Sequence, residues 1–223
     1  MRDKGFTLLE LMIAVALIAM IATIAGPSVS GFIDKRKIIN AAEAVYSQLQ
    51  FARSQAISRS TQIYVRFDYD DPTDKSTWLI GLHAHPPINS GTPAFCDLTK
   101  KVTPTDVSDD CTLVVSDGLA GLDDGTGTID PNDLVYFVTS GTDFNGVMID
   151  ANSTGTGGAP NQLTFNPTRG TASNQTIYLW FDGGNRQYAM RVVIGSIGRV
   201  RICTPVGADA VPGYTTTTQA TGC

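Results

Sequence analysis

Hydrophobic positions follow three different patterns along this chain. From Phe6 to Ala25 the sequence is one apolar run with a single charge, at Glu10. Between residues 29 and 60 the apolar residues repeat at alternating spacings of four and three, which is typical of one face of a helix. The residues that form this stripe are Ile38, Ala42, Val45, Leu49, Ala52 and Ala56. We therefore expect one long helical region, apolar all round in its first half and amphipathic in its second.

After residue 60 the period changes to two, as in half-buried strands. In residues 62–69 the apolar side chains Ile63, Val65 and Phe67 share one face. The turn sequence Asp182-Gly183-Gly184-Asn185 predicts a hairpin. Further strands are expected at residues 78–82, 113–115, 134–138, 146–149, 163–165, 177–181, 186–194 and 199–203.

These patterns predict an α+β fold in which a long N-terminal helix packs on a β-rich head. The alternative partner for the amphipathic stripe is a coiled-coil neighbour, but the head of the same chain is the better candidate. We divide the chain into a leader at residues 1–5, a helix at 6–60 with a membrane segment at 6–25, and a head at 61–223.

The apolar run fits a membrane span. As a helix, residues 6–25 would extend about 30 Å, which is the thickness of a bilayer's hydrocarbon core. Arg2 and Lys4 precede the run, and positive charge favours the cytoplasmic side, so the head is expected on the outer side. Gly26-Pro27 ends the run. Because proline removes a helical hydrogen bond and clashes with the preceding turn, we expect a kink or local melting there.

Glu10 is the unusual residue of this span. A carboxylate in a membrane helix costs a few kcal/mol and normally has a partner. Cleavage between Gly5 and Phe6 would create a positive α-amine on Phe6, which Glu10 of a neighbouring subunit could neutralise. At ~4 Å and an effective dielectric constant near 20, this attraction is about 4 kcal/mol before desolvation. The simpler alternative is an uncut single-pass anchor.

The segment Lys4-Gly5-Phe6-Thr7-Leu8-Leu9-Glu10 resembles the cleavage and methylation motif of type IV prepilins. The resemblance implies that a prepilin peptidase cuts after Gly5, that Phe6 becomes N-methylated, and that Glu10 contributes to register during filament assembly. It also implies a single-pass protein of the inner membrane. Its head would lie in the periplasm and later on a pilus or pseudopilus at the cell surface.

Composition and motifs narrow the functional classes. The sequence is 42% hydrophobic and 17% charged, as expected of a folded chain. It contains no nucleophile–base motif, phosphate loop or metalloprotease motif, so we expect neither an enzyme nor a cofactor. Residues 123–130 lack the ordered carboxylates of a calcium loop, and His83 with His85 would lack a third ligand, so no metal site is expected.

The four cysteines predict two disulfides if the head is exported. Cys96–Cys111 and Cys203–Cys223 would each close a loop of roughly 15–20 residues and contribute about 3 kcal/mol. Their spacing forms no C-x-x-C pair of a zinc or redox site. Free buried thiols are the alternative for a cytosolic head, and the sequence alone does not fix the pairing.

The segment Gly198-Arg199-Val200-Arg201 is the most informative part of the head. On a strand, Arg199 and Arg201 would point to one face about 7 Å apart, which suits neighbouring phosphates of a nucleic-acid strand. Gly198 would free the turn and let a ligand approach. Arg186 and Arg191 could widen this patch from the adjacent strand. The alternative is a solvated strand face or pairing with carboxylates. Because the net charge is -5, nucleic-acid binding would have to rest on such a local basic patch.

The helix end Gln50–Ile57 and the segment Gly198–Cys203 are similar to the FimT/FimU/GspH family of minor pilins and pseudopilins. The resemblance implies the type IV pilin fold. In FimT-like members, the G-R-x-R motif near the C-terminus is associated with binding DNA during natural transformation. Carried over to this chain, the motif implies that Arg199 and Arg201 contact phosphates and that Gly198 shapes their loop.

Three functions follow from these observations. The first is a minor type IV pilin that is incorporated into a pilus, helps to prime it and binds DNA for uptake. The second is a type II secretion minor pseudopilin with a purely structural role at a filament tip. The third, a monomeric membrane-anchored binding domain, leaves the cleavage motif unexplained. The expected partners are other major and minor pilins or pseudopilins, the prepilin peptidase, the inner membrane and double-stranded DNA.

Overall fold

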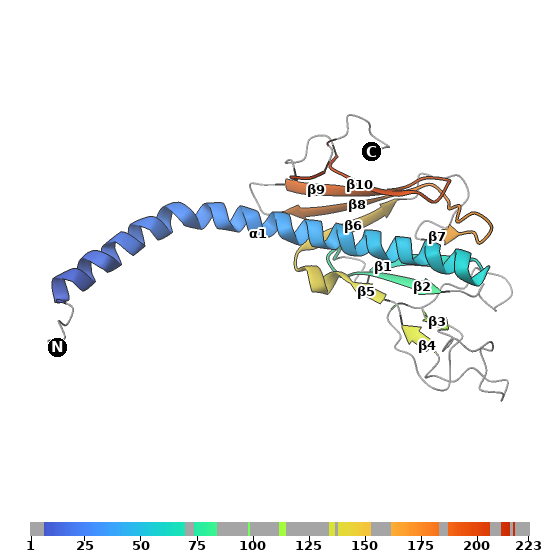
Figure 1. The fold of residues 1–223 in the computed structure, drawn as a ribbon, viewed down its shortest axis with the longest axis horizontal. Coiled ribbons are helices and arrows are strands. Elements are labelled where there is room, and N and C mark those ends of the chain that lie inside the picture. Colours follow the sequence, from blue (N-terminus) through green and yellow to red (C-terminus); the bar gives the residue numbers. More distant parts are fainter. Residues whose placement is uncertain are drawn as a thin grey trace, which may run out of the picture.

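A single long helix carries the whole head (Figure 1). The computed structural model describes residues 7–69, 74–83, 98, 112–114, 134–136, 138–152, 162–182, 187–205, 211–214 and 216. Helix α1 comprises Leu8–Arg59 and ends at Ser60, whose φ of 53° is left-handed. The α+β architecture expected from the sequence, a long N-terminal helix packed on a β-rich head, is confirmed.

Helix α1 is continuous through Gly26-Pro27, so the expected local melting is wrong. The helix instead curves smoothly before it reaches the head (Figure 1). Proline is tolerated inside a helix when a bend absorbs its clash with the preceding turn. Within the described part of the chain, no helix is long and apolar enough to cross a membrane.

The described strands form two four-stranded antiparallel sheets and one separate pair. The first sheet has the order β5-β2-β1-β7, the second has the order β10-β9-β8-β6, and β3 pairs with β4. The strands are β1 (Ile63–Tyr69), β2 (Trp78–His83), β3 (Thr112–Val114), β4 (Leu134–Tyr136), β5 (Val138–Ser140), β6 (Val147–Asn152), β7 (Gln162–Phe165), β8 (Gln175–Asp182), β9 (Gln187–Ile194) and β10 (Val200–Cys203).

Every strand expected from the sequence has a counterpart, with one division. The segment expected as a single strand at residues 134–138 contributes to two different ladders. Its first part is β4, which pairs with β3, whereas β5 begins at Val138 and pairs with β2. Sequence alternation cannot predict this division, because it depends on which partner strand lies alongside.

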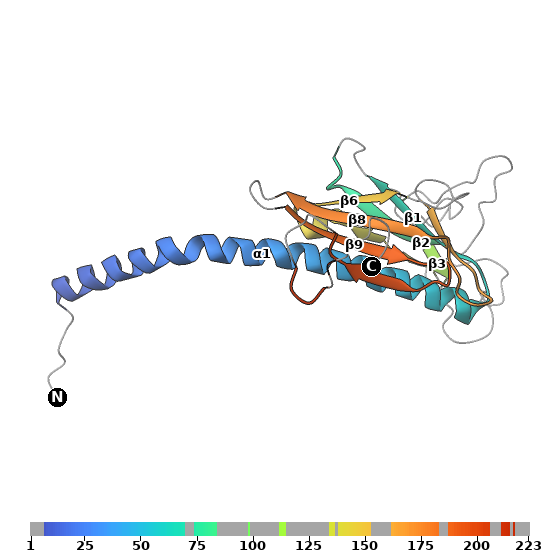
Figure 2. The same ribbon diagram turned by 90° about the horizontal axis from the view of Figure 1, so that it is seen from above.

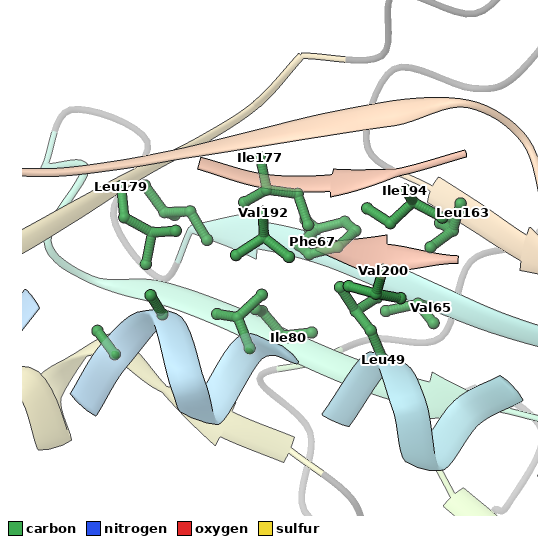
Figure 3. Close-up of a cluster of buried hydrophobic side chains, with 14 of the residues drawn as sticks. Leu49, Val65, Phe67, Ile80, Leu163, Ile177, Leu179, Val192, Ile194 and Val200 are labelled. Carbon is green, nitrogen blue, oxygen red and sulfur yellow. The ribbon is translucent and has the colours of Figure 1, made fainter. Parts of the chain in front are cut away.

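The second half of α1 packs against both four-stranded sheets (Figures 1 and 2). The expected stripe is buried completely: each of its members is 0% exposed, and Ala41 joins them. Figure 3 shows the core that results, in which Leu49 of α1 lies close to Val65 and Val200, from one strand of each sheet. Alanine at four of the seven buried helix positions lets the backbones approach closely. These seven positions are Ile38, Ala41, Ala42, Val45, Leu49, Ala52 and Ala56.

Two buried hydrogen bonds tie the layers together. Gln48 Nε2 on α1 donates to the backbone oxygen of Ile80 in β2 at 3.0 Å. Trp78 Nε1 in the first sheet donates to the backbone oxygen of Val147 in the second sheet at 2.9 Å. A buried donor without a partner costs about 1–3 kcal/mol, so these bonds fix how the helix and the sheets sit relative to one another.

The contribution of the helix stripe to stability can be tested by shortening the side chain of Leu49 at its centre. Leu49→Ala leaves a cavity between the sheets, and we expect it to lower the free energy of unfolding by about 2–5 kcal/mol. Chemical denaturation followed by circular dichroism measures the change. Ile33→Ala serves as the control, because Ile33 is half-exposed on the same helix, and it should cost less than about 1 kcal/mol. Equal effects of the two substitutions would contradict the packing described here.

Candidate functional site

The G-R-x-R segment comprises the last two residues of the β9–β10 turn and the first two of β10, at the end of the head where α1 terminates (Figure 1). Two backbone hydrogen bonds close the turn: Gly198 N donates to Gly195 O at 2.8 Å, and Gly195 N donates to Arg199 O at 3.0 Å. Antiparallel pairing then continues, with Val200 opposite Ile194 and Arg201 opposite Val193. The turn is therefore a well-defined extension of the second sheet.

Gly198 serves the protein's own packing. Its φ is +71°, and a Cβ placed on it would lie 1.8 Å from the backbone oxygen of Gly170. Gly170 is left-handed too, with a φ of +58°, and lies against Ile57 of α1. Only glycine fits both positions. The left-handed φ agrees with the expectation that Gly198 frees the turn, and the space beside its Cα is taken by Gly170. The expected role of Gly198 in DNA binding stays a prediction.

Arg53 of α1 lies beneath this contact between the two glycines. Its Nη2 donates to the backbone oxygen of Ile197 at 3.3 Å. Its Nε lies 3.0 Å from the position that a Cβ on Gly198 would take, and 2.9 Å from the same position on Gly170. The side chain therefore connects the helix to both turns. Sequence analysis missed Arg53 and Gly170, since the contact joins segments far apart in the chain.

Arg199 and Arg201 are both exposed, whereas Val200 between them is 5% exposed and belongs to the core. This alternation agrees with the expected common face of the two arginines. Among the residues described, Arg199 pairs with no carboxylate. A guanidinium group without an acidic partner remains available to an anionic ligand.

Of the two further arginines of the expected patch, only Arg191 lies among the described residues. Arg186 lies outside the described residues. Arg191 is 9% exposed, and its guanidinium group lies 4.8 Å from the ring centroid of Tyr178 in a cation–π contact. Burial and this contact give Arg191 a structural role in the second sheet.

The described segments around the turn contain basic but no acidic residues. Residues 44–67, 162–181 and 187–205 hold no Asp or Glu. They hold arginines at the end of α1, in the turn after β7, in the β9–β10 turn and in strands β1, β9 and β10. These are Arg53 and Arg59, Arg169, Arg199, and Arg66, Arg191 and Arg201. Of these, Arg66 is paired with Asp68 at 2.6 Å. Burial also lowers the pKa of Arg59 from its ordinary value, although an arginine stays charged at neutral pH.

At the other end of the chain, Glu10 is engaged within its own helix. Its Oε2 accepts hydrogen bonds from the backbone N and from Oγ1 of Thr7, both at 3.0 Å. Thr7 in turn caps the helix by accepting from the backbone N of Glu10, which completes a capping box. The Thr-x-x-Glu pattern carries this signal, which sequence analysis missed. Gly5 and Phe6 lie outside the described residues.

Of the four cysteines, only Cys203 lies among the described residues. Cys203 is fully buried and disulfide-bonded. Its expected partner Cys223 lies outside the described residues, as do Cys96 and Cys111, so both pairings stay predictions. The segment at residues 123–130, for which no calcium site is expected, and His85 also lie outside the described residues. His83 is 6% exposed and stacks on Tyr64 with ring centroids 4.9 Å apart, as a core histidine does.

A recess lies between residues 211–214 of the C-terminal segment and α1. It has a volume of about 380 Å³ and is lined by Phe32, Lys35, Arg36, Ile39, Glu43, Pro212, Gly213 and Tyr214. The Tyr214 hydroxyl donates to Glu43 Oε1 at 2.7 Å. Burial, together with this hydrogen bond and the charge of Glu43, raises the pKa of Tyr214 to about 12, so the phenol stays protonated. The recess is therefore held together by contacts within the chain.

Comparison with known proteins gives two family matches. Residues 41–198 match the family model described as Type II transport protein GspH, and residues 1–26 match the Prokaryotic N-terminal methylation motif. The curated Type II secretion system protein H of Xanthomonas campestris pv. campestris is 36% identical over 58 residues, which are 26% of this chain and 34% of that protein. The aligned part thus spans about a third of the relative's length.

Two solved structures are similar to this chain at low identity. One is the type IV minor pilin FimU of Pseudomonas aeruginosa, at 17% identity and a TM-score of 0.42, covering 77% of this chain and 91% of that one. The other is the minor pseudopilin EpsH from the Type 2 Secretion System of Vibrio cholerae. It has 13% identity and a TM-score of 0.39, and the match covers 75% of this chain and 97% of that one.

The close contact between Gly198 and Gly170 predicts that a side chain at position 198 destabilises the protein. We expect Gly198→Ala to lower the free energy of unfolding by about 2 kcal/mol or more, because the new methyl group meets a backbone oxygen and the residue keeps a left-handed φ. Gly195→Ala in the same turn is the matched control, since its nearest neighbour would lie 3.9 Å away. Thermal unfolding of both variants decides the point. A Gly198→Ala variant as stable as Gly195→Ala would show that the turns do not touch.

Proposed function

The chain belongs to the family of type II transport protein GspH, and we propose that it acts as a minor type IV pilin that helps to prime a pilus and binds DNA. Family membership itself makes it a minor pilin or pseudopilin, a structural subunit of a type IV pilus or of a type II secretion filament. Such subunits assemble with other pilins or pseudopilins. The choice of the pilus, the priming role and the DNA are our proposal.

The observation that carries the DNA proposal is the exposure of Arg199 and Arg201 on a rigid turn. The turn is braced from below by Arg53 and Gly170, so the backbone next to the two arginines has little conformational freedom to lose. Rigid presentation lowers the entropic cost of binding. The absence of acidic residues from the described segments around the turn favours an anionic partner despite the net charge of -5.

The second candidate is a type II secretion minor pseudopilin with a structural role only. It is favoured by the match to the Type II transport protein GspH family and by the similarity to Type II secretion system protein H of Xanthomonas campestris. The family match ends at residue 198, so it does not include Arg199 or Arg201. In this case the exposed arginines would be a solvated surface without a nucleic-acid ligand.

We propose that the N-terminus is processed as in prepilins, with cleavage between Gly5 and Phe6 and methylation of Phe6. The match of residues 1–26 to the methylation motif supports this proposal. The apolar run from Phe6 to Ala25 would then anchor the subunit in the inner membrane, with the head in the periplasm, until assembly. During assembly, the Glu10 carboxylate would give up its hydrogen bonds with Thr7 and pair instead with the α-amine of a neighbouring subunit.

Mass spectrometry of the protein isolated from its native host tests the processing. We expect a mature N-terminus at Phe6 that carries one added methyl group. In Gly5→Val, the bulkier residue before the scissile bond should block the peptidase, so unprocessed protein should accumulate. Mature protein that retains Met1 would contradict the proposed cleavage.

Binding of the full-length protein in detergent to duplex DNA tests the nucleic-acid role. For a handful of phosphate contacts we expect a dissociation constant of about 10⁻⁴ to 10⁻⁶ M near physiological salt. Arg199→Ala with Arg201→Ala should weaken binding and reduce the slope of log K against log salt by about 2. Fluorescence anisotropy over a salt series measures both quantities.

The matched control is Arg36→Ala with Lys37→Ala, which removes the same charge near the opposite end of the head. This variant should bind almost as the parent does, because charges farther away than about 10 Å are largely screened at 0.1 M salt. If the parent protein fails to bind DNA at low salt, the structural pseudopilin is the better assignment.

A further inference from the structure

A third exposed arginine lies next to the G-R-x-R turn in space but not in sequence. Arg169 belongs to the turn that follows β7 and immediately precedes Gly170. Arg199 immediately follows Gly198, the glycine that contacts Gly170. The two arginines thus flank the same pair of touching glycines, from two turns about thirty residues apart in the chain.

The turn that carries Arg169 is rigid. The backbone N of Asn166 donates to the backbone oxygen of Thr171 at 2.8 Å, which closes the turn at its base. The amide of Gln62, just before β1, donates to the side-chain oxygen of Asn166 at 2.9 Å. These bonds fix the backbone on which Arg169 stands, while its own side chain remains exposed.

The two turns are also joined directly. The backbone N of Ala172 donates to the backbone oxygen of Ser196 at 3.1 Å, and the Gly170–Gly198 contact leaves no space for a side chain between them. Arg53 of α1 contacts both glycines from below. The two turns therefore form one surface and move as one body.

The charges on this surface are not neutralised by the described residues. Neither Arg169 nor Arg199 pairs with a carboxylate there. Exposed arginines that lack acidic neighbours bind phosphate well, because the guanidinium group donates two parallel hydrogen bonds to it. Ile197, in the same β9–β10 turn, is 66% exposed.

We infer that Arg169 is a further phosphate-contacting residue, so that the DNA surface spans both turns instead of the β9–β10 turn alone. This inference rests on the proposed DNA binding. The ligand is the phosphate backbone of duplex DNA, and the contact adds affinity without base specificity. An acidic protein surface is the competing partner, and the experiment distinguishes it.

The experiment compares Arg169→Ala with the parent full-length protein in detergent, using a fluorescent duplex of random sequence over a salt series. We expect the slope of log K against log salt to fall by about 0.9, which corresponds to one lost phosphate contact. Arg169→Lys should keep the slope, because the charge remains. Combination with Arg199→Ala and Arg201→Ala should bring the total fall to about 3, since independent phosphate contacts add.

Two controls accompany the comparison. Thr168→Ala alters the same turn without a change of charge and should leave the slope unchanged. Arg36→Ala removes one positive charge near the opposite end of the head and should change the slope by much less than Arg169→Ala. The unfolding midpoint of each variant should match that of the parent, since all three side chains are exposed.

The outcomes separate this inference from the proposed function. If the parent binds and loss of Arg199 and Arg201 lowers the slope, but Arg169→Ala does not, the DNA role stands and the two-turn surface is wrong. If Arg169→Ala blocks incorporation into the filament while the slope stays the same, the surface contacts a protein subunit and the inference is overturned. If the parent does not bind DNA, both proposals fail.

Discussion

The burial of one helix face determines the structure of the head. The stripe from Ile38 to Ala56 is excluded from water by two sheets at once, so the helix is the common wall of the core. Burial of apolar surface stabilises the fold by about 25 cal/mol per Å². The side chains of the stripe are all fully buried, so their whole apolar surface contributes. The small alanines matter as much as Leu49, since they let strands of both sheets approach one helix. Without this helix face, the core would lose the side chains against which both sheets pack.

The same helix also organises the end of the head that faces away from the N-terminus. Arg53 directly follows Ala52 in sequence, so a residue next to the buried stripe reaches both glycine turns. The position of the arginines at this end is therefore set by the packing of the core. The described side chains of residues 8–21 differ sharply, because all of them are exposed in the isolated chain. Exposed apolar surfaces of this kind normally mark an interaction site.

Net charge is a poor guide to the partner of this protein. The chain carries a net charge of -5, yet the described segments around the β9–β10 turn hold arginines and no carboxylate. At physiological ionic strength the field of a charge extends only about 8 Å, so a ligand at this end responds to the local arginines. An acidic protein can therefore bind an anionic polymer at one end.

The sequence by itself determined the elements and the class of the protein. The buried helix stripe, the face of β1 with Ile63, Val65 and Phe67, and the prepilin motif are local patterns, and local patterns depend on residues close in sequence. Only the tertiary structure decided that Gly198 touches Gly170, that Arg53 reaches Ile197, and that Arg191 is buried on Tyr178. These contacts join segments that are distant along the chain, and their formation depends on how the two sheets pack on α1. For that reason, no local sequence pattern predicts that Arg169 and Arg199 lie on one surface.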